Sequence, residues 1–181
     1  GHLKYEGSID PKVTGGFDNG FTYKNWKMNV YFTYQFGNVI RLYPEFSAVY
    51  SDMSAMPKEM KNRWMQAGNE KYTDVPGIPS KRQVSNIENL NVAYNAYNYS
   101  DARVANGSFI RLKEISLSYD FKGNWMKVVG MNNLQLRCVA SNLWLIYSDK
   151  KLNGQDPEFF RSGGVAMPTP RQFTLSVRTS F

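Results

Sequence analysis

Side chains suited to catalysis are scarce in this chain of 181 residues. His2 is the only histidine and Cys138 is the only cysteine, and they lie at distant positions. A Ser–His or Cys–His nucleophile and most zinc sites need such residues beside suitable partners, and a disulfide needs two cysteines. No pair of Asp and Glu residues stands out for acid–base work. We therefore expect no enzymatic activity, no metal site and no cofactor.

The net charge of +7 raises the question of a nucleic-acid partner. Residues 38–106 hold eight basic and seven acidic side chains, and residues 148–169 hold three of each. The excess positive charge therefore falls on the other segments, at scattered positions. Because nucleic-acid-binding domains gather their basic residues on one face or helix, we expect no nucleic-acid partner.

The end of the chain alternates strictly between apolar and polar residues. One face carries Phe173, Leu175, Val177 and Phe181, and polar residues stand between them. This alternation predicts a strand with one apolar face, and a tilted strand of about 9–11 residues can cross an outer membrane. A chain that ends in an aromatic residue on such a strand resembles bacterial outer-membrane β-barrels, whose last strand carries the assembly signal. The edge strand of a soluble sandwich would have the same pattern.

Four further segments alternate in the same way, so we predict an all-β fold with five antiparallel strands. The strands span residues 13–24, 27–37, 108–121, 134–147 and 171–181. The connections are alternately short and long: 25–26, 38–106, 122–133 and 148–169. Antiparallel pairing places both long connections at one end of the sheet. Short periplasmic turns and long extracellular loops are typical of transmembrane β-barrels.

The connection 38–106 is long for a compact soluble domain, where unstructured loops above about 15 residues are uncommon. Within it, Pro57, Met60, Trp64 and Gly68 predict a short amphipathic helix over residues 56–66.

No stretch of 18 apolar residues is present in the sequence, which excludes a transmembrane helix. No secretory signal peptide opens the chain, so we expect either a cytoplasmic protein or a segment of a longer one.

Several short motifs occur in a fixed order along the chain. Residues 106–119 read N-G-S-F-I-R-L-K-E-I-S-L-S-Y, residues 154–158 read G-Q-D-P-E, and residues 168–175 read P-T-P-R-Q-F-T-L. Residues 139–144 are similar to a G-x-N-L-F strand, with Ser141 in place of the glycine and Trp144 in place of the phenylalanine. Together with residues 11–17 and 62–64, these motifs resemble the SusC/RagA family, the TonB-dependent outer-membrane transporters of Bacteroidetes.

The resemblance implies the C-terminal segment of a 22-stranded barrel whose plug domain and TonB box are absent from this chain. It implies a bacterial outer-membrane location, contact with lipid, and coupling to the TonB complex through the missing N-terminal region. A SusD-like surface lipoprotein would cover the extracellular mouth. The expected substrate is an oligosaccharide, with a peptide as the alternative. A soluble carbohydrate-binding β-sandwich is the alternative of another class.

The candidates for contact with substrate or partner are four loop aromatics and one acid: Trp64, Tyr94, Tyr97, Tyr99 and Asp156. Aromatic rings can stack on sugar faces, but such rings also pack loops against themselves. Asp156 could bind a cation or a hydroxyl, or close an Asp-Pro turn. The expected barrel-assembly signal is Phe173, Leu175, Val177 and Phe181. Near the short turns, Tyr23, Trp26 and Trp125 predict an interfacial aromatic girdle.

Overall fold

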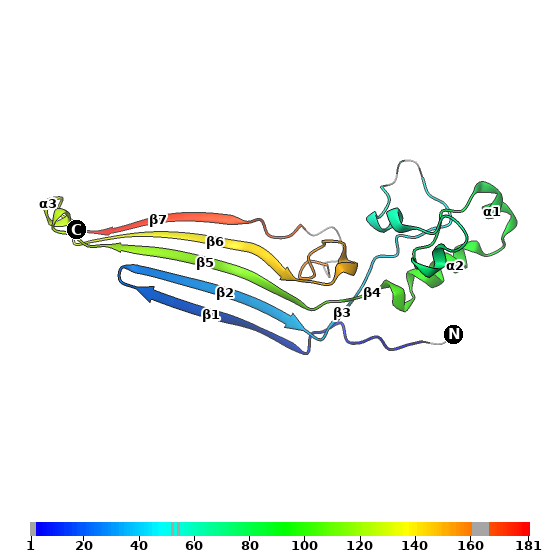
Figure 1. The fold of residues 1–181 in the computed structure, drawn as a ribbon, viewed down its shortest axis with the longest axis horizontal. Helices are drawn as coiled ribbons and strands as arrows, with labels where there is room; N and C mark the ends of the chain where they lie inside the picture. Colours follow the sequence, from blue (N-terminus) through cyan, green and yellow to red (C-terminus); the bar gives the residue numbers. More distant parts are fainter. Residues whose placement is uncertain (1–2, 52, 54, 161–166) are drawn as a thin grey trace.

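A computed structural model describes residues 3–51, 53, 55–160 and 167–181. Five long strands form one antiparallel sheet in the order β1-β2-β5-β6-β7 (Figure 1). The strands are β1 (Val13–Tyr23), β2 (Trp26–Phe36), β5 (Phe109–Phe121), β6 (Asn133–Tyr147) and β7 (Gln172–Ser180). Each boundary lies within one residue of the range expected from alternation. In the described residues, no helix is both long and apolar enough to span a membrane.

The register of the sheet gives it one apolar and one polar face. Residues directly opposite each other in an antiparallel pair share a face. One row across all five strands contains Phe21, Met28, Leu117, Cys138 and Leu175. The next row contains Thr22, Lys27, Ser118, Arg137 and Ser176. The alternation in each strand is thus in phase with that of its neighbours, which produces two chemically distinct surfaces.

Cross-strand polar contacts tie the polar face together. The Asn29 amide donates to both carboxylate oxygens of Asp18 at 3.2 Å. Asp120 pairs with Lys27 Nζ at 2.9 Å and accepts a hydrogen bond from Gln135 Nε2 at 2.6 Å. The apolar face instead carries aromatic contacts near the short turns, where Trp26 packs against Tyr119 at 4.6 Å between ring centroids.

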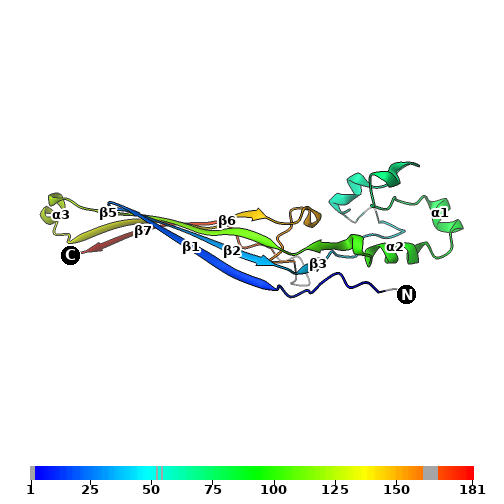
Figure 2. The ribbon, with the colours of Figure 1, turned by 60° about the horizontal axis from the view of Figure 1, so that its bottom comes forward.

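The sheet is a single layer, and its connections differ at the two ends (Figures 1 and 2). The β1–β2 turn, the β5–β6 connection and the C-terminus lie at one end, which we call the turn end. Both long connections lie at the other end, which we call the loop end. A β-sandwich needs two stacked sheets, whereas the described residues form this sheet and one short pair, β3 (Val39–Arg41) with β4 (Val104–Asn106). The sandwich alternative is therefore wrong for this arrangement.

The two long connections fold together into a unit that we call the loop body, residues 37–108 and 148–160. Its helical segments are η1 (Lys58–Asn62), η2 (Asn69–Lys71), α1 (Lys81–Asn86), α2 (Leu90–Asn98), η3 (Asp101–Arg103) and η4 (Lys150–Leu152). One buried cluster contains Ile40, Leu42, Ala105 and Leu152, and a second contains Phe46, Ala48, Met60 and Tyr94. The loop body thus has apolar cores of its own, while both faces of the sheet stay open.

The helix predicted over residues 56–66 is only one short 3₁₀ helix, η1. Met60 is buried as expected, but the backbone turns extended at Arg63, and the Trp64 N–H bonds to the Val75 carbonyl at 2.9 Å. Trp64 therefore pairs with a neighbouring segment instead of continuing the helix. Alternation and turn signals also missed α1, α2 and the short helix α3 (Asn124–Val128) in the β5–β6 connection.

Candidate functional site

The candidate site is the loop body, because the two long connections meet there. Asp149 Oδ2 accepts a hydrogen bond from the Asn106 N–H at 2.7 Å, and Lys151 Nζ donates to the Val104 carbonyl at 3.2 Å. Leu152 of the second connection is 1% exposed, inside the cluster formed by the first. These contacts join segments about 45 residues apart in the sequence, so the two connections form one surface.

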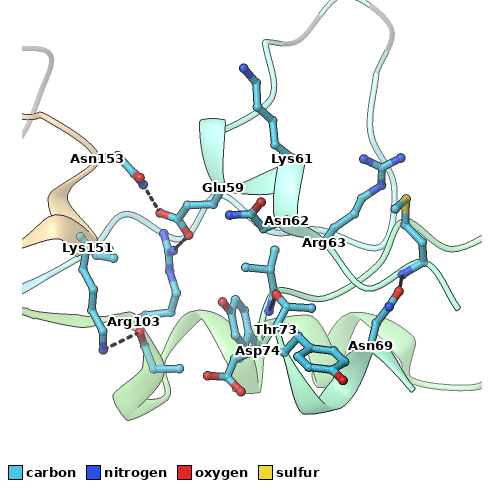
Figure 3. Close-up of a pocket in the computed structure, with 16 residues that line it drawn as sticks. Glu59, Lys61, Asn62, Arg63, Asn69, Thr73, Asp74, Arg103, Lys151 and Asn153 are labelled. Atoms are coloured by element: carbon cyan, nitrogen blue, oxygen red, sulfur yellow. Dashed lines mark hydrogen bonds and ion pairs between the residues drawn. The ribbon is translucent and has the colours of Figure 1, made fainter. Parts of the chain in front are cut away.

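A buried arginine lies at the centre of this junction (Figure 3). Arg103 is 2% exposed, pairs with the Glu59 carboxylate and donates to the Tyr43 carbonyl at 2.9 Å. Its guanidinium also lies 4.8 Å from the centroid of the Phe46 ring. The other Glu59 oxygen accepts from the Asn153 amide at 2.7 Å. Because Asn153 belongs to the second connection, one carboxylate couples both connections to the buried charge.

Beside this junction, a pocket of about 520 Å³ opens between η1 and α2 (Figure 3). Most of its lining residues are of polar or charged types, including Glu59, Asn62, Thr73, Tyr97 and Arg103. Amides, hydroxyls and charged groups of both signs can bind a hydroxyl-rich ligand or a peptide with charged groups. No histidine is among the residues that line this pocket, so none of its hydroxyl groups has a neighbouring histidine there to act as a base.

A second pocket of about 540 Å³ lies along α1 and α2, and most of its lining residues are apolar. Trp64 and Tyr94 both line it, together with Ile78, Pro79, Ile87 and Leu90. Tyr94 is only 9% exposed, and its hydroxyl donates to the Gly77 carbonyl. Burial raises the pKa of the Tyr94 hydroxyl, and it likewise raises that of Tyr97. Both hydroxyls therefore stay protonated at neutral pH.

The four candidate aromatics thus differ in their surroundings. Tyr94 belongs to the second core cluster, and Tyr97 packs against it with its ring edge-on to Phe46 at 5.0 Å. Trp64 is 40% exposed and Tyr99 is 62% exposed. The structure brings Trp64 and Tyr94 to one pocket and Tyr97 to the other, whereas Tyr99 lines neither of these two pockets.

Asp156 lies in a buried ion cluster that connects the loop body to the sheet. Its carboxylate pairs with Arg111 of β5, and Glu158 lies 3.2 Å from Arg111 Nε. Asp156 Oδ1 also accepts from the Glu158 N–H at 3.1 Å, which closes the local turn. Arg111 belongs to the N-G-S-F-I-R-L-K motif and both acids to G-Q-D-P-E, so these two motifs meet in space.

Sequence reasoning missed Arg103, Glu59, Asn153 and Arg111 as organising residues. Their partners lie 44 to 94 positions away, and no local periodicity marks such pairs.

The expected assembly residues Phe173, Leu175 and Val177 occupy the apolar face of the edge strand β7, and they are 64% to 76% exposed. Phe181 follows the strand at the turn end and is 83% exposed.

Known proteins are similar to this chain in sequence, and solved structures are similar to it in fold. No protein-family model matches the chain. TonB-dependent receptor P3 of Formosa agariphila is 27% identical over 155 residues, which cover 86% of this chain and 14% of the receptor. TonB-dependent receptor P26 of the same organism is 26% identical over 187 residues, covering 97% of the chain and 17% of the receptor. The chain thus spans about a seventh of the length of these relatives.

Solved structures of the RagAB peptide importer have a similar fold. The RagAB peptide transporter superimposes with a TM-score of 0.67 at 23% identity, over 99% of this chain and 18% of the other. The importer in its open-open state gives a TM-score of 0.64 at 22% identity, over 98% and 18%. The single-layer sheet with a loop body at one end is therefore an arrangement found within a much longer chain.

Proposed function

Since the chain is a segment of a TonB-dependent outer-membrane receptor of the SusC/RagA family, we propose that it forms the last five strands of an importer's barrel. In this proposal the barrel has 22 strands, the turn end faces the periplasm and the loop end faces outward. The apolar face meets lipid and the polar face lines the interior. The observation that carries the proposal is the in-phase register, which gives all five strands one continuous apolar face. Only a sheet that is solvated differently on its two sides needs that pattern.

Two features of the apolar face support contact with lipid. Leu175 and Val177 are 66% and 64% exposed, so the described part of the chain leaves most of both side chains uncovered. Aromatic residues gather near the ends of the strands, with Tyr23, Trp26 and Tyr119 at the turn end and Tyr34 stacked on Phe36 towards the loop end. Aromatic rings prefer the two membrane–water interfaces. The spacing of the two groups fits strands that cross the hydrocarbon layer once.

The loop body is the proposed contact region for substrate and for a SusD-like lipoprotein lid. Trp64 and Tyr99 are the exposed candidates, while Tyr94, Tyr97 and Asp156 would act from the pockets or by holding the loop body in place. Exposed apolar residues such as Ile87, which follows α1, and Val92 in α2 support a partner surface, because exposed apolar groups that lie together mark interaction sites. Energy would come from the TonB complex through residues outside this chain.

The proposed cargo is an oligosaccharide, and the second candidate is a peptide. The aromatic candidates and the amide and hydroxyl groups of the polar pocket favour a sugar. The three RagAB structures are of a peptide importer, and the mixed charges of the same pocket would suit peptide termini.

Uptake by cells tests the function and separates the two cargoes. We expect a strain without the receptor to lose energy-dependent uptake of fluorescent oligosaccharides, and the intact gene to restore it. Trp64→Ala and Tyr99→Ala should raise the concentration for half-maximal uptake by about threefold to tenfold, corresponding to about 0.6–1.4 kcal/mol. Restored uptake of labelled peptides alone would assign the peptide cargo. Unchanged uptake of both cargoes in the deletion strain would reject the importer.

A further inference from the structure

Residues 63–75, which we call the ridge loop, form a wall that the polar pocket and the second pocket share. Arg63 and Met65 line both pockets. Of the two aromatic residues in the ridge loop, Tyr72 lines the polar pocket and Trp64 lines the second pocket. The pockets measure about 520 and 540 Å³, which is within the range of small-molecule sites. The ridge loop therefore presents one aromatic side chain to each of two adjacent hollows.

Hydrogen bonds inside the ridge loop hold both aromatic residues in place. The Trp64 N–H donates to the Val75 carbonyl at 2.9 Å, which closes the loop at its ends. The side-chain oxygen of Asn69 accepts from two backbone N–H groups before it, at 3.1 and 3.2 Å, and its backbone carbonyl accepts from the Tyr72 N–H at 2.9 Å. Glu70 Oε2 accepts from the indole N–H of Trp64 at 3.1 Å. The indole of Trp64 and the backbone of Tyr72 are thus both fixed by partners within the same loop.

Tyr72 is the most exposed aromatic residue in the described part of the loop body. It is 87% exposed, compared with 62% for Tyr99 and 40% for Trp64. A tyrosine ring has only two rotatable side-chain bonds, so little conformational entropy is lost when a ligand covers it. A backbone that is already ordered reduces that loss further. Tyr72 is therefore suited to bind a ligand at the rim of the polar pocket.

The surroundings of the two rings match the two kinds of surface on a sugar. A sugar ring has an apolar C–H face, which can stack on an aromatic ring, and a rim of hydroxyl groups. Beside Tyr72, the polar pocket offers the amide, hydroxyl and carboxylate groups of Asn62, Thr73 and Asp74 (Figure 3). In the second pocket, a Cβ added at Gly77 would lie 3.4 Å from the Trp64 ring, so the glycine lets the indole approach the backbone there.

We propose that the ridge loop binds one oligosaccharide chain across both pockets, with Tyr72 and Trp64 as stacking platforms for sugar rings on its two sides. The inference rests on the proposed function, names its cargo class and adds Tyr72 as a specificity-determining residue. Because the pockets share a wall, a single sugar fills one of them, whereas a longer chain contacts both. A peptide of ordinary composition lacks the repeated ring faces that two platforms can bind, so the arrangement favours an oligosaccharide.

A glycan array probed with the full-length receptor, purified in detergent from outer membranes, tests the proposal. The array carries monosaccharides and plant, algal and bacterial oligosaccharides of increasing length, and a parallel array carries peptides. We expect the receptor to bind a set of oligosaccharides and no monosaccharide. Tyr72→Ala should weaken binding to that set about tenfold, which corresponds to about 1.4 kcal/mol, whereas Tyr72→Phe should keep it because the ring remains. Trp64→Ala should weaken binding to the same oligosaccharides.

Tyr5→Ala is the matched control, because Tyr5 is 83% exposed and lines neither pocket. It should bind like the unchanged receptor. The proposal is overturned if Tyr72→Ala binds like Tyr5→Ala, if monosaccharides bind as tightly as oligosaccharides, or if the receptor binds peptides alone or nothing on either array. It is also overturned if Tyr72→Ala and Trp64→Ala weaken different oligosaccharides, since one chain would then not cross both pockets.

This experiment separates the ridge loop from the proposed importer. Binding to the purified receptor needs no energy coupling, so a receptor that imports nothing can still give the expected pattern. Conversely, cells whose oligosaccharide uptake depends on the receptor but is unchanged by Tyr72→Ala would support the importer and reject the role of Tyr72.

Discussion

Leu175→Arg is expected to reduce the amount of assembled receptor in the outer membrane several-fold. Leu175 lies on the apolar face of β7, is 66% exposed and stands opposite Cys138 in the row that crosses all five strands. A charged side chain on the lipid face near the bilayer midplane costs about 2–4 kcal/mol. The matched control is Thr174→Arg, one residue away on the polar face, which should leave the amount of receptor nearly unchanged.

Quantitative blotting of purified outer membranes measures this effect. Deletion of Phe181 should lower the amount as well if the terminal strand carries the assembly signal, while the receptor that does assemble keeps its affinity for substrate. Normal amounts of both the Leu175→Arg and the Phe181-deletion receptors would reject the signal role. Equal losses for Leu175→Arg and Thr174→Arg would show that the two faces of β7 do not differ in their surroundings.

Arg111→Met is expected to release the 148–160 connection from the sheet. The substitution leaves the Asp156 carboxylate, whose side chain is 9% exposed, without its cation, and breaking a buried pair by removing one partner costs about 3–5 kcal/mol. The exposed Arg137–Glu114 pair, at 4.0 Å, provides the control, because Arg137→Met should cost at most about 1 kcal/mol. The denaturant dependence of proteolysis within residues 150–160 reports the free energy of local unfolding.

A double substitution distinguishes the ion pair from a simple loss of packing. Arg111→Met combined with Asp156→Leu replaces both charges with apolar groups, which is often neutral for a buried pair. We therefore expect most of the lost protection from proteolysis to return in the double variant. Protection in Arg111→Met that equals the protection of the Arg137→Met control would contradict the anchoring role of Arg111.

The sheet could be predicted because its information is local. Alternation in 173–181 or 28–36 marks each strand without knowledge of its partner. Two irregularities in β5 could not be seen: its register with β6 shifts between Ile110 and Arg111 and again between Leu112 and Glu114. The second shift also occurs in the pairing with β2, and it keeps Leu112 on the apolar face with Phe32. A one-residue slip would otherwise move every later side chain to the opposite face.

The loop body could not be predicted because its structure depends on distant contacts. The segment that forms α2, L-N-V-A-Y-N-A-Y-N, holds three asparagines, which are weak helix formers, and it is helical where Tyr94 and Tyr97 pack against Phe46 and Met60. Strands β3 and β4 have three residues each, too few for a periodic signal. The Arg103–Glu59 pair forms only after distant parts of the first connection have met, and the Arg111–Asp156 pair forms only after the second connection has folded against β5.

Cysteine labelling on intact cells tests most directly whether the loop end faces outward. Val92 in α2 and Val129 beside α3 are 62% and 59% exposed, and they lie at opposite ends of the molecule. In a full-length receptor without other cysteines, Cys138→Ala included, we expect a membrane-impermeant maleimide to label Val92→Cys on intact cells. Val49→Cys, a second exposed position in the loop body, should behave in the same way. Val129→Cys should react only after the outer membrane has been permeabilised. Labelling of Val129→Cys on intact cells, with Val92→Cys and Val49→Cys protected until permeabilisation, would contradict the proposed orientation.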